Sequence, residues 1–263
     1  MKNTRMIELE HIDFRYRDQD VLRNVSFSLP KGEAIAIVGA SGCGKSTLLR
    51  LISGILPNNP QNKLNGNIYI NSLAPEEYRI KGKLSFMFQE NTLMPNLTVK
   101  DNITLPLKIQ GVADNQKVNK LIEIVGLQAY ANFLPKHLSG GMKTRVALAR
   151  SFINNPDLLL LDEPFSALDI AWKSKLYKEL DKLRNRFNTT MIVVTHDVQE
   201  ALLLANHIVV LNNVGEVEMK KAIQSDYNIT ERVNNISGFM NSVYSNYMIP
   251  IQNAIINGNK IEV

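Results

Sequence analysis

Apolar and polar residues alternate over residues 7–29, and turn-forming sequences interrupt the alternation at residues 17–20 and 30–32. A period of two is typical of strands with one buried face, so we expect the chain to begin with antiparallel β-structure. Residues 34–38 are continuously apolar, which predicts a strand buried on both faces.

The apolar period changes to that of a helix over residues 45–53, and Gly54 marks the end of this helix. The polar sequence at residues 57–67 predicts a surface loop. Apolar runs at residues 68–70 and 84–88 predict two further strands.

Between residues 89 and 153 the strand patterns disappear and the apolar positions follow a helical period. The helix boundaries are marked by a capping-box pattern at Thr98 and Asp101, an N-cap at Asp114, a stop at Gly126, and a Ser139 cap on a helix that reaches Phe152. We interpret this stretch as a helical subdomain inserted into an α/β core.

Strands and helices alternate again after the helical stretch. We expect strands at residues 158–161, 191–195 and 208–211, with a helix at residues 171–187 and a short helix opened by Asp197. Apolar strands alternating with helices predict a parallel sheet covered on both faces. The predicted single domain consists of a core (residues 1–88 and 154–225), an inserted helical subdomain (residues 89–153) and an Asn-rich C-terminal tail (residues 226–263).

Composition limits the class of protein. The 263 residues are 44% hydrophobic and 21% charged, as in an ordinary soluble globular protein. No apolar run approaches the roughly 18 residues of a membrane-spanning helix, and the N-terminus lacks the apolar stretch of a signal peptide, so a cytosolic location is expected. The net charge of +5 comes from dispersed basic residues, which argues against nucleic acid as a partner.

The first candidate site is the sequence GASGCGKST at residues 39–47, between the buried strand and the helix that follows it. It fits G-x-x-x-x-G-K-[ST], in which backbone N–H groups surround phosphates at a helix N-terminus. Lys45 is expected to reach the β- and γ-phosphates, the Ser46 hydroxyl to bind Mg²⁺, and Thr47 to contact the α-phosphate. The predicted nucleotide-binding residues are Gly39, Ala40, Ser41, Gly42, Cys43, Gly44, Lys45, Ser46 and Thr47.

Two adjacent carboxylates, Asp162 and Glu163, follow the predicted strand at residues 158–161. Open α/β sheets bind ligands at the carboxyl ends of their strands, so Asp162 is expected to hold Mg²⁺ through its hydration shell. Glu163 is then the candidate that orients or deprotonates an attacking water. The alternative interpretation is a solvated strand end.

Cys43 is the single cysteine of the chain, which excludes an internal disulfide and any metal site built from several cysteines. Because it lies inside the phosphate-binding loop, two interpretations are open. It is a small tolerated residue, or it is a reactive thiol near a helix N-terminus that switches nucleotide binding.

Two further motifs define the kind of nucleotide-binding protein: LSGGM at residues 138–142 precedes a helix, and LLLLDEP at residues 158–164 contains the two carboxylates. With these motifs the chain resembles the ATP-binding subunit of an ATP-binding-cassette (ABC) transporter over most of residues 5–220. The resemblance is nearest to importer subunits of the nitrate, sulfonate and taurine group, through the phosphate-binding loop, LSGGM and THDVQEA at residues 195–201. It implies an α/β P-loop NTPase core with a mostly parallel sheet, an N-terminal antiparallel β part and an inserted helical subdomain.

The resemblance also implies roles for single residues. Gln89 would sense Mg²⁺ and the γ-phosphate, and His196 would touch the γ-phosphate. An aromatic side chain stacks on adenine in the family; Tyr16 fits this role, with Phe14 as the competing choice.

Ser139, Gly140 and Gly141 lie on the helical insert, where a capped helix N-terminus forms an anion site. In the family this site meets the γ-phosphate bound by a second copy, so that ATP lies between two chains, and SALD at residues 166–169 crosses the same interface. Met142 departs from the commonest family pattern, which has Gln there, and this puts in doubt a side-chain hydrogen bond to nucleotide.

The implied partners are a second copy of the chain, integral membrane permease subunits and, indirectly, an extracytoplasmic solute-binding protein, with ATP and Mg²⁺ as cofactors at the cytoplasmic face of the membrane. Apolar residues such as Leu93, Met94 and Leu97 within residues 88–102 would fill the helical subdomain, form a groove for a permease helix, or do both. Two alternatives remain open: an exporter or lipoprotein-release ATPase, and a non-transport ABC protein acting on nucleic acid or ribosomes.

Overall fold

The computed structural model describes residues 5–56, 59–90, 92–224 and 229–257. The strands are β1 (Arg5–Tyr16), β2 (Gln19–Pro30), β3 (Ala34–Gly39), β4 (Asn62–Ile70), β5 (Leu84–Met87), β6 (Leu158–Asp162), β7 (Thr190–Val194), β8 (His207–Leu211) and β9 (Val217–Ala222). The α-helices are α1 (Lys45–Ser53), α2 (Pro75–Ile80), α3 (Val99–Ile109), α4 (Asn115–Ile124), α5 (Gly140–Phe152), α6 (Ile170–Phe187), α7 (Val198–Leu204), α8 (Ile229–Asn234), α9 (Ile236–Val243) and α10 (Ile249–Asn257).

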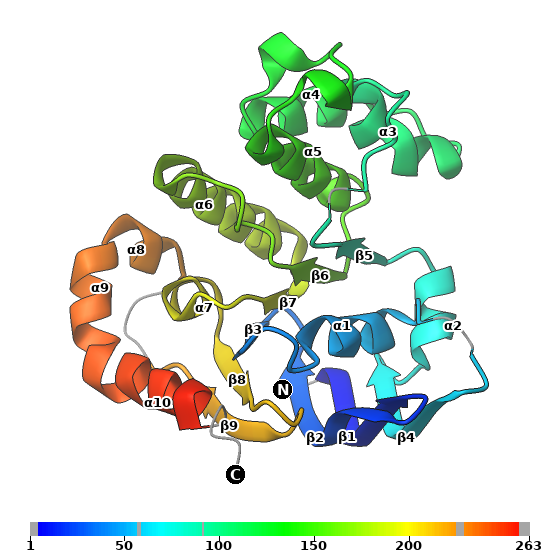
Figure 1. Cartoon of the computed structure of the whole chain (residues 1–263). Coiled ribbons are helices and arrows are strands. Elements are labelled where there is room, and N and C mark those ends of the chain that lie inside the picture. The colour runs from blue at the N-terminus through cyan, green and yellow to red at the C-terminus, as the bar shows by residue number, and fades with distance from the viewer. Residues whose placement is uncertain (1–4, 57–58, 91, 225–228, 258–263) are drawn as a thin grey trace.

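Two sheets form the framework of the molecule (Figure 1). The first is antiparallel, with the strand order β2-β1-β4. The second has the order β5-β6-β7-β3-β8-β9, and its strands are parallel except for β9, which runs antiparallel to β8. The predicted antiparallel start and mostly parallel core sheet are therefore confirmed.

The central strand β3 is buried along its whole length because both faces of its sheet are covered. Ile35 and Ile37 belong to the apolar cluster formed with α1 and the antiparallel sheet. Ala34, Ala36 and Val38 belong to a second cluster, formed with α6, α7 and the C-terminal helices. This alternation explains why β3 reads as one continuous apolar run.

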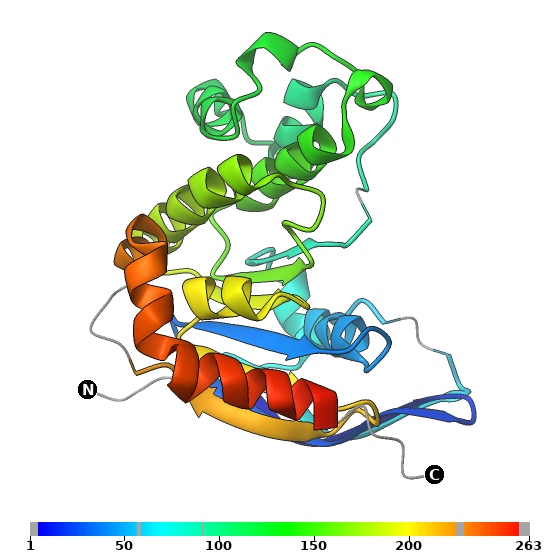
Figure 2. The same cartoon turned by 60° about the vertical axis from the view of Figure 1, so that its left-hand side comes forward.

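Helices α3, α4 and α5 lie between β5 and β6 in the chain and form a group at one end of the molecule (Figure 2). Their predicted caps are present: the side chains of Thr98, Asp114 and Ser139 accept backbone N–H groups at the starts of α3, α4 and α5. The group packs on α6, where the Arg145 guanidinium lies 3.7 Å from the ring centroid of Trp172. Over the described ranges, no helix has both the length and the apolar character needed to cross a bilayer.

The prediction of a loop at residues 57–67 is wrong for its second half, which is part of β4. Asn62 and Leu64 pair with Tyr16 and Phe14 of β1. The side chains from residue 63 to residue 67 are exposed, because this end of β4 is an edge strand held by its backbone ladder. Its polar composition therefore gives no strand signal.

Helix α2 was not predicted, although it starts with Pro75 and carries Glu76 and Glu77 in its first turn. Proline at the first helical position and early acidic residues are the expected signals of a helix start. Six residues are too few for an apolar period to be visible.

The tail, which the sequence left without a predicted structure, forms α8, α9, a π-helical turn at Tyr244–Met248 and α10 along the β8–β9 side of the sheet (Figure 1). Phe239, Val243, Tyr247 and Ile251 are buried in the core at a spacing of four residues. Arg232 is buried and donates to the carbonyl oxygens that end α7, at Leu202 (3.1 Å) and Ala205 (2.6 Å). The predicted core–tail boundary at residue 225 lies outside the described residues.

Candidate nucleotide site

The phosphate-binding loop connects β3 to α1 and presents the N-terminus of α1. Gly44 precedes the helix with φ 98°, and a Cβ there would lie 2.8 Å from the Val21 carbonyl oxygen of β2. Both the backbone conformation and the close approach therefore require glycine at this position. A Cβ on Gly42, in contrast, would meet no described atom within 4 Å. The loop is closed on its β2 side and open on the other.

Lys45 is almost fully buried at 6% exposure, with its ammonium group folded onto the loop. Its Nζ donates to the carbonyl oxygens of Gly39 (2.8 Å) and Ala40 (2.6 Å), and it makes a long contact of 3.8 Å with Cys43 Sγ. An ammonium group has three N–H donors, so the one at the sulfur is available for a stronger acceptor. A phosphate oxygen is such an acceptor.

Ser46 joins the loop to the end of β6, because its hydroxyl donates to Asp162 Oδ1 at 3.1 Å. Asp162 is buried at 3% exposure, and burial raises the pKa of its carboxyl. The hydrogen bond from Ser46 lowers that pKa, and the neighbouring Glu163 raises it. A hydroxyl and a buried carboxylate are hard oxygen donors of the kind that Mg²⁺ prefers, so these residues fit that ion.

Glu163 has φ 46°, which is unusual for a residue with a side chain and is found at functional sites. Its N–H donates to the Val194 carbonyl oxygen of β7 at 2.9 Å. Its carboxylate Oε2 lies 3.3 Å from Nδ1 of His196, which follows β7 and has a 61% exposed side chain. The two residues therefore form one carboxylate–imidazole pair beside Asp162.

Gln89 is exposed and follows β5 by two residues. Met87 of β5 pairs with Leu161 of β6. Gln89 and Glu163 each follow this pair by two residues, so both lie at the same edge of the sheet. The carboxyl ends of β3, β5, β6 and β7 thus carry the loop, Gln89, the two carboxylates and His196.

Of the remaining loop residues, Ser41 is exposed, Ala40 and Thr47 are partly buried, and Cys43 is buried. Burial raises the pKa of the Cys43 thiol, and the nearby Lys45 lowers it. A buried, protonated thiol reacts slowly. This environment favours the interpretation of Cys43 as a packing residue over that of a reactive switch.

We expect iodoacetamide to modify Cys43 at least about ten times more slowly in the native protein than in the urea-unfolded chain, since the thiol is buried and mostly protonated. Mass spectrometry of timed, quenched samples measures both rates. Equal rates would contradict this prediction and support the reactive-thiol interpretation.

The two aromatic candidates for adenine differ in exposure. Phe14 is 2% exposed and packs in the core, whereas Tyr16 is partly exposed and makes an edge-on contact with Phe14 at 4.8 Å between ring centroids. Phe14 pairs with Leu22, whose Cδ2 would lie 2.8 Å from a Cβ on Gly44. This end of β1 is therefore beside the phosphate-binding loop, and Tyr16 has the more accessible ring.

Ser139, Gly140 and Gly141 form the N-terminus of α5, apart from α1 (Figure 1). Ser139 is exposed, and its hydroxyl accepts the N–H of Met142 at 3.3 Å. A Cβ on Gly140 would meet no described atom within 4 Å, whereas one on Gly141 would lie 3.1 Å from the Ala167 carbonyl oxygen. The free helix end therefore lies against residues 166–169, and Met142 packs its side chain on the core.

Asn102 was not among the predicted site residues, yet it organises the loop before α3. It is fully buried, accepts the N–H of Met94 at 2.8 Å and donates to the carbonyl oxygens of Met94, Leu97 and Thr98. An asparagine on the apolar face of a helix is the sequence signal that points to such a role. Leu93 packs on the core, while Met94 is 44% exposed.

A family model described as "ABC transporter" matches residues 22–166. The aliphatic sulfonates import ATP-binding protein SsuB of Bacillus cereus is 42% identical over 73% of this chain and 74% of that protein. The maltose/maltodextrin import ATP-binding protein MalK of Mannheimia succiniciproducens is 35% identical over 98% of this chain and 68% of that protein. The spermidine/putrescine import ATP-binding protein PotA of Thermotoga maritima is 40% identical over 80% of this chain, which spans 57% of that protein.

Among solved structures, a dimeric post-hydrolysis state of an ATP-binding cassette bound to ADP and Pi is similar with a TM-score of 0.75. It is 32% identical in sequence, and the match covers 84% of this chain and 100% of that chain. Another dimeric bacterial ABC transporter cassette is similar with a TM-score of 0.71 at 33% identity over the same shares.

Proposed function

The chain belongs to the ABC transporter family as an ATP-binding and ATP-hydrolysing domain, and on this basis we propose that it powers solute import through separate membrane permease subunits. The observation that carries the proposal is the convergence of Lys45, Ser46, Asp162 and Glu163 at one edge of the sheet, together with an exposed, serine-capped helix end at the N-terminus of α5. The import direction is supported by the relatives, which are import ATP-binding proteins.

At the phosphate site, the loop backbone and Lys45 bind and orient the β- and γ-phosphates of ATP. Glu163 holds the attacking water and accepts its proton, while His196 fixes the carboxylate and contacts the γ-phosphate. Tyr16 stacks on adenine. Each of these groups lies at or beside the carboxyl ends of the parallel strands, so chemistry is confined to one edge of the sheet.

Ser46, Gln89 and Asp162 are the residues that would hold Mg²⁺, with Asp162 acting through the hydration shell. When bound there, the ion neutralises phosphate charge that develops during transfer.

The α5 N-terminus supplies the second half of the site in a dimer. Ser139, Gly140 and Gly141 are open to solvent, partly or fully, and a helix N-terminus attracts anions through its free N–H groups and its dipole. Two copies facing each other would enclose two ATP molecules, each between the loop of one chain and the α5 terminus of the other. The dimeric cassettes that resemble this chain support this arrangement.

Residues 89–153 act in this proposal as the helical subdomain, residues 1–88 and 154–225 as the nucleotide-binding core, and residues 226–263 as the tail.

The loop at residues 92–98 is the proposed docking site for a permease helix at the cytoplasmic face of the membrane. Asn102 holds this loop, and Arg150 donates to Thr92 within it. Leu93 stabilises the loop from inside, and the exposed Met94 provides the contact.

We expect Met94→Glu to reduce assembly with the permease at least about tenfold, because a charged side chain would enter an apolar contact. The matched control is Val214→Glu, which changes an apolar residue of similar exposure in the β8–β9 turn, 47% against 44%. The measurement is the amount of permease recovered with each tagged variant in mild detergent. Equal recovery with Met94→Glu and wild type, with both folded, would exclude this loop as the docking site.

The proposed function as a whole is tested by purifying the tagged chain from its native membrane in mild detergent and identifying its partners. A polytopic permease supports a transport ATPase. A solute-binding protein recovered with it supports import and identifies the solute, for which we propose the nitrate, sulfonate and taurine class. Recovery with ribosomes or nucleic acid and without membrane protein would overturn the transport function and leave the ATPase chemistry intact.

A further inference from the structure

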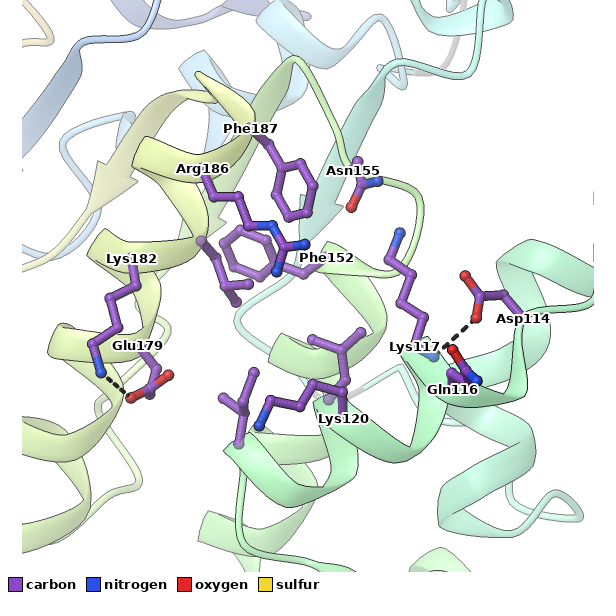
Figure 3. A pocket seen from close by; sticks show the side chains of 13 residues that line it. Asp114, Gln116, Lys117, Lys120, Phe152, Asn155, Glu179, Lys182, Arg186 and Phe187 are labelled. Atoms are coloured by element: carbon purple, nitrogen blue, oxygen red, sulfur yellow. Dashed lines mark hydrogen bonds and ion pairs between the residues drawn. The ribbon is translucent and has the colours of Figure 1, made fainter.

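A cavity of about 530 Å³ opens between α4 and α6, and none of its lining residues belongs to the nucleotide site (Figure 3). Ligand cavities in proteins are on the order of 300–1,000 Å³. The apolar part of its lining consists of Leu121, Ile124, Phe152, Leu183 and Phe187. We call this cavity the α4–α6 pocket.

Four cationic side chains surround the apolar lining, and they differ in their partners. Lys182 is paired with Glu179 at 2.8 Å, and Lys120 is paired with Glu123 at 3.0 Å. Lys117 and Arg186, in contrast, form no ion pair with a carboxylate among the residues that the structure describes. Two charges in the pocket are therefore available to a ligand.

Lys117 and Arg186 approach the same aromatic ring from different helices. Lys117 Nζ lies 5.9 Å and Arg186 Cζ 5.4 Å from the ring centroid of Phe187. Figure 3 shows the two side chains extending towards each other from α4 and α6 beside the rings of Phe152 and Phe187. Burial lowers the pKa of Lys117, the nearby Asp114 raises it, and Arg186 lowers it. An anion between the two cations would offset both the burial and the repulsion.

A much smaller apolar recess of about 10 Å³ adjoins the pocket on its α5 side. It shares Leu121, Ile124, Phe152 and Leu183 with the pocket and adds Leu148 of α5. This volume is too small for an alkyl chain, so the apolar group of a ligand would lie on the lining of the α4–α6 pocket itself, while its charged head remains at the two cations.

We propose that the α4–α6 pocket binds a small amphipathic anion, with its carboxylate, sulfonate or similar head between Lys117 and Arg186 and its short alkyl or aryl group on the apolar lining. The bound molecule would bridge α4 of the helical group and α6 of the core. Helix α6 begins directly after residues 166–169, which lie against the α5 N-terminus. A ligand that bridges α4 and α6 would therefore affect the position of the helical group relative to α6. The inference does not depend on the proposed transport function.

The test is isothermal titration of octanoate into the full chain. Wild-type protein is expected to bind octanoate saturably at one site, and Lys117→Gln and Arg186→Gln are each expected to weaken binding about tenfold or more, since each removes a charge-assisted contact. The matched control is Lys178→Gln, which removes one charge from α6 outside the pocket and should change the affinity less than about twofold.

Octanamide, which has the same chain without the charge, is expected to bind about tenfold more weakly than octanoate. Equal affinity for octanamide, or an equal loss in Lys178→Gln, would overturn the proposal. The proposal would also be overturned if protein that still binds ATP showed no saturable binding of octanoate. Binding of an acidic peptide to the same face would not rescue it.

Discussion

Glu163→Gln is expected to lower steady-state ATP hydrolysis by about 10²–10³-fold or more while leaving ATP binding nearly unchanged, because an amide cannot accept the proton of the attacking water. The substitution keeps the size of the side chain. Glu163 has no role in nucleotide binding in the proposed function, in which the loop and Lys45 contact the phosphates, while Ser46 connects the loop to Asp162 of β6. ATP therefore binds and is trapped, and the protein should accumulate as an ATP-bound dimer.

The measurements are phosphate release at saturating ATP and light scattering with MgATP. Glu218→Gln is the control, since it makes the same chemical change at an exposed position of β9 and should leave both measurements as in wild type. Turnover equal to wild type in Glu163→Gln would remove Glu163 from the catalytic role. The left-handed backbone at Glu163 tolerates glutamine as well as glutamate, so loss of folding is not the expected cause of any effect.

Much of the core was predictable because its signals are local. The strands β3, β6, β7 and β8 each contain a continuous run of four or five apolar residues, and α1, α3, α4 and α5 begin or end at residues whose chemistry marks a helix terminus. The position of the proposed phosphate site was predictable because the loop and the two carboxylates occur in motifs placed directly after strands. Their convergence required only that the strands be parallel.

Features that depend on tertiary contacts were not predictable. The outer half of β4 is polar and exists because β1 pairs with its backbone. The tail helices carry apolar side chains at a four-residue spacing from Phe239 to Ile251. That these side chains are buried depends on packing against the β8–β9 surface, which the local sequence does not show. The α4–α6 pocket combines residues of two helices that are 69 positions apart in the chain, Lys117 and Arg186. Such a pair has no sequence motif.

Ser139→Arg is expected to keep nucleotide binding to the monomer within about twofold while reducing hydrolysis on the order of 100-fold or more, since half of each composite site is lost. Ser139 is exposed, and a Cβ on the neighbouring Gly140 would meet no described atom within 4 Å, so arginine at residue 139 can extend into solvent without disturbing the core. In the proposed dimer, the space beside Gly140 is filled by the γ-phosphate of the partner copy. A side chain as long as arginine would hold the two copies apart despite its favourable charge.

The cap and the interface must be separated, because Ser139 also accepts the N–H of Met142 at the start of α5. Ser139→Ala removes the cap without adding bulk, and its cost is about 1 kcal/mol of unfolding free energy. If hydrolysis falls mainly in the arginine variant, packing at the interface is the cause rather than helix stability. The decisive measurement combines Ser139→Arg with Glu163→Gln. Glu163→Gln alone should form the ATP-bound dimer, and the double variant should remain monomeric with ATP bound. A dimer in the double variant would show that the α5 N-terminus does not face the partner's nucleotide.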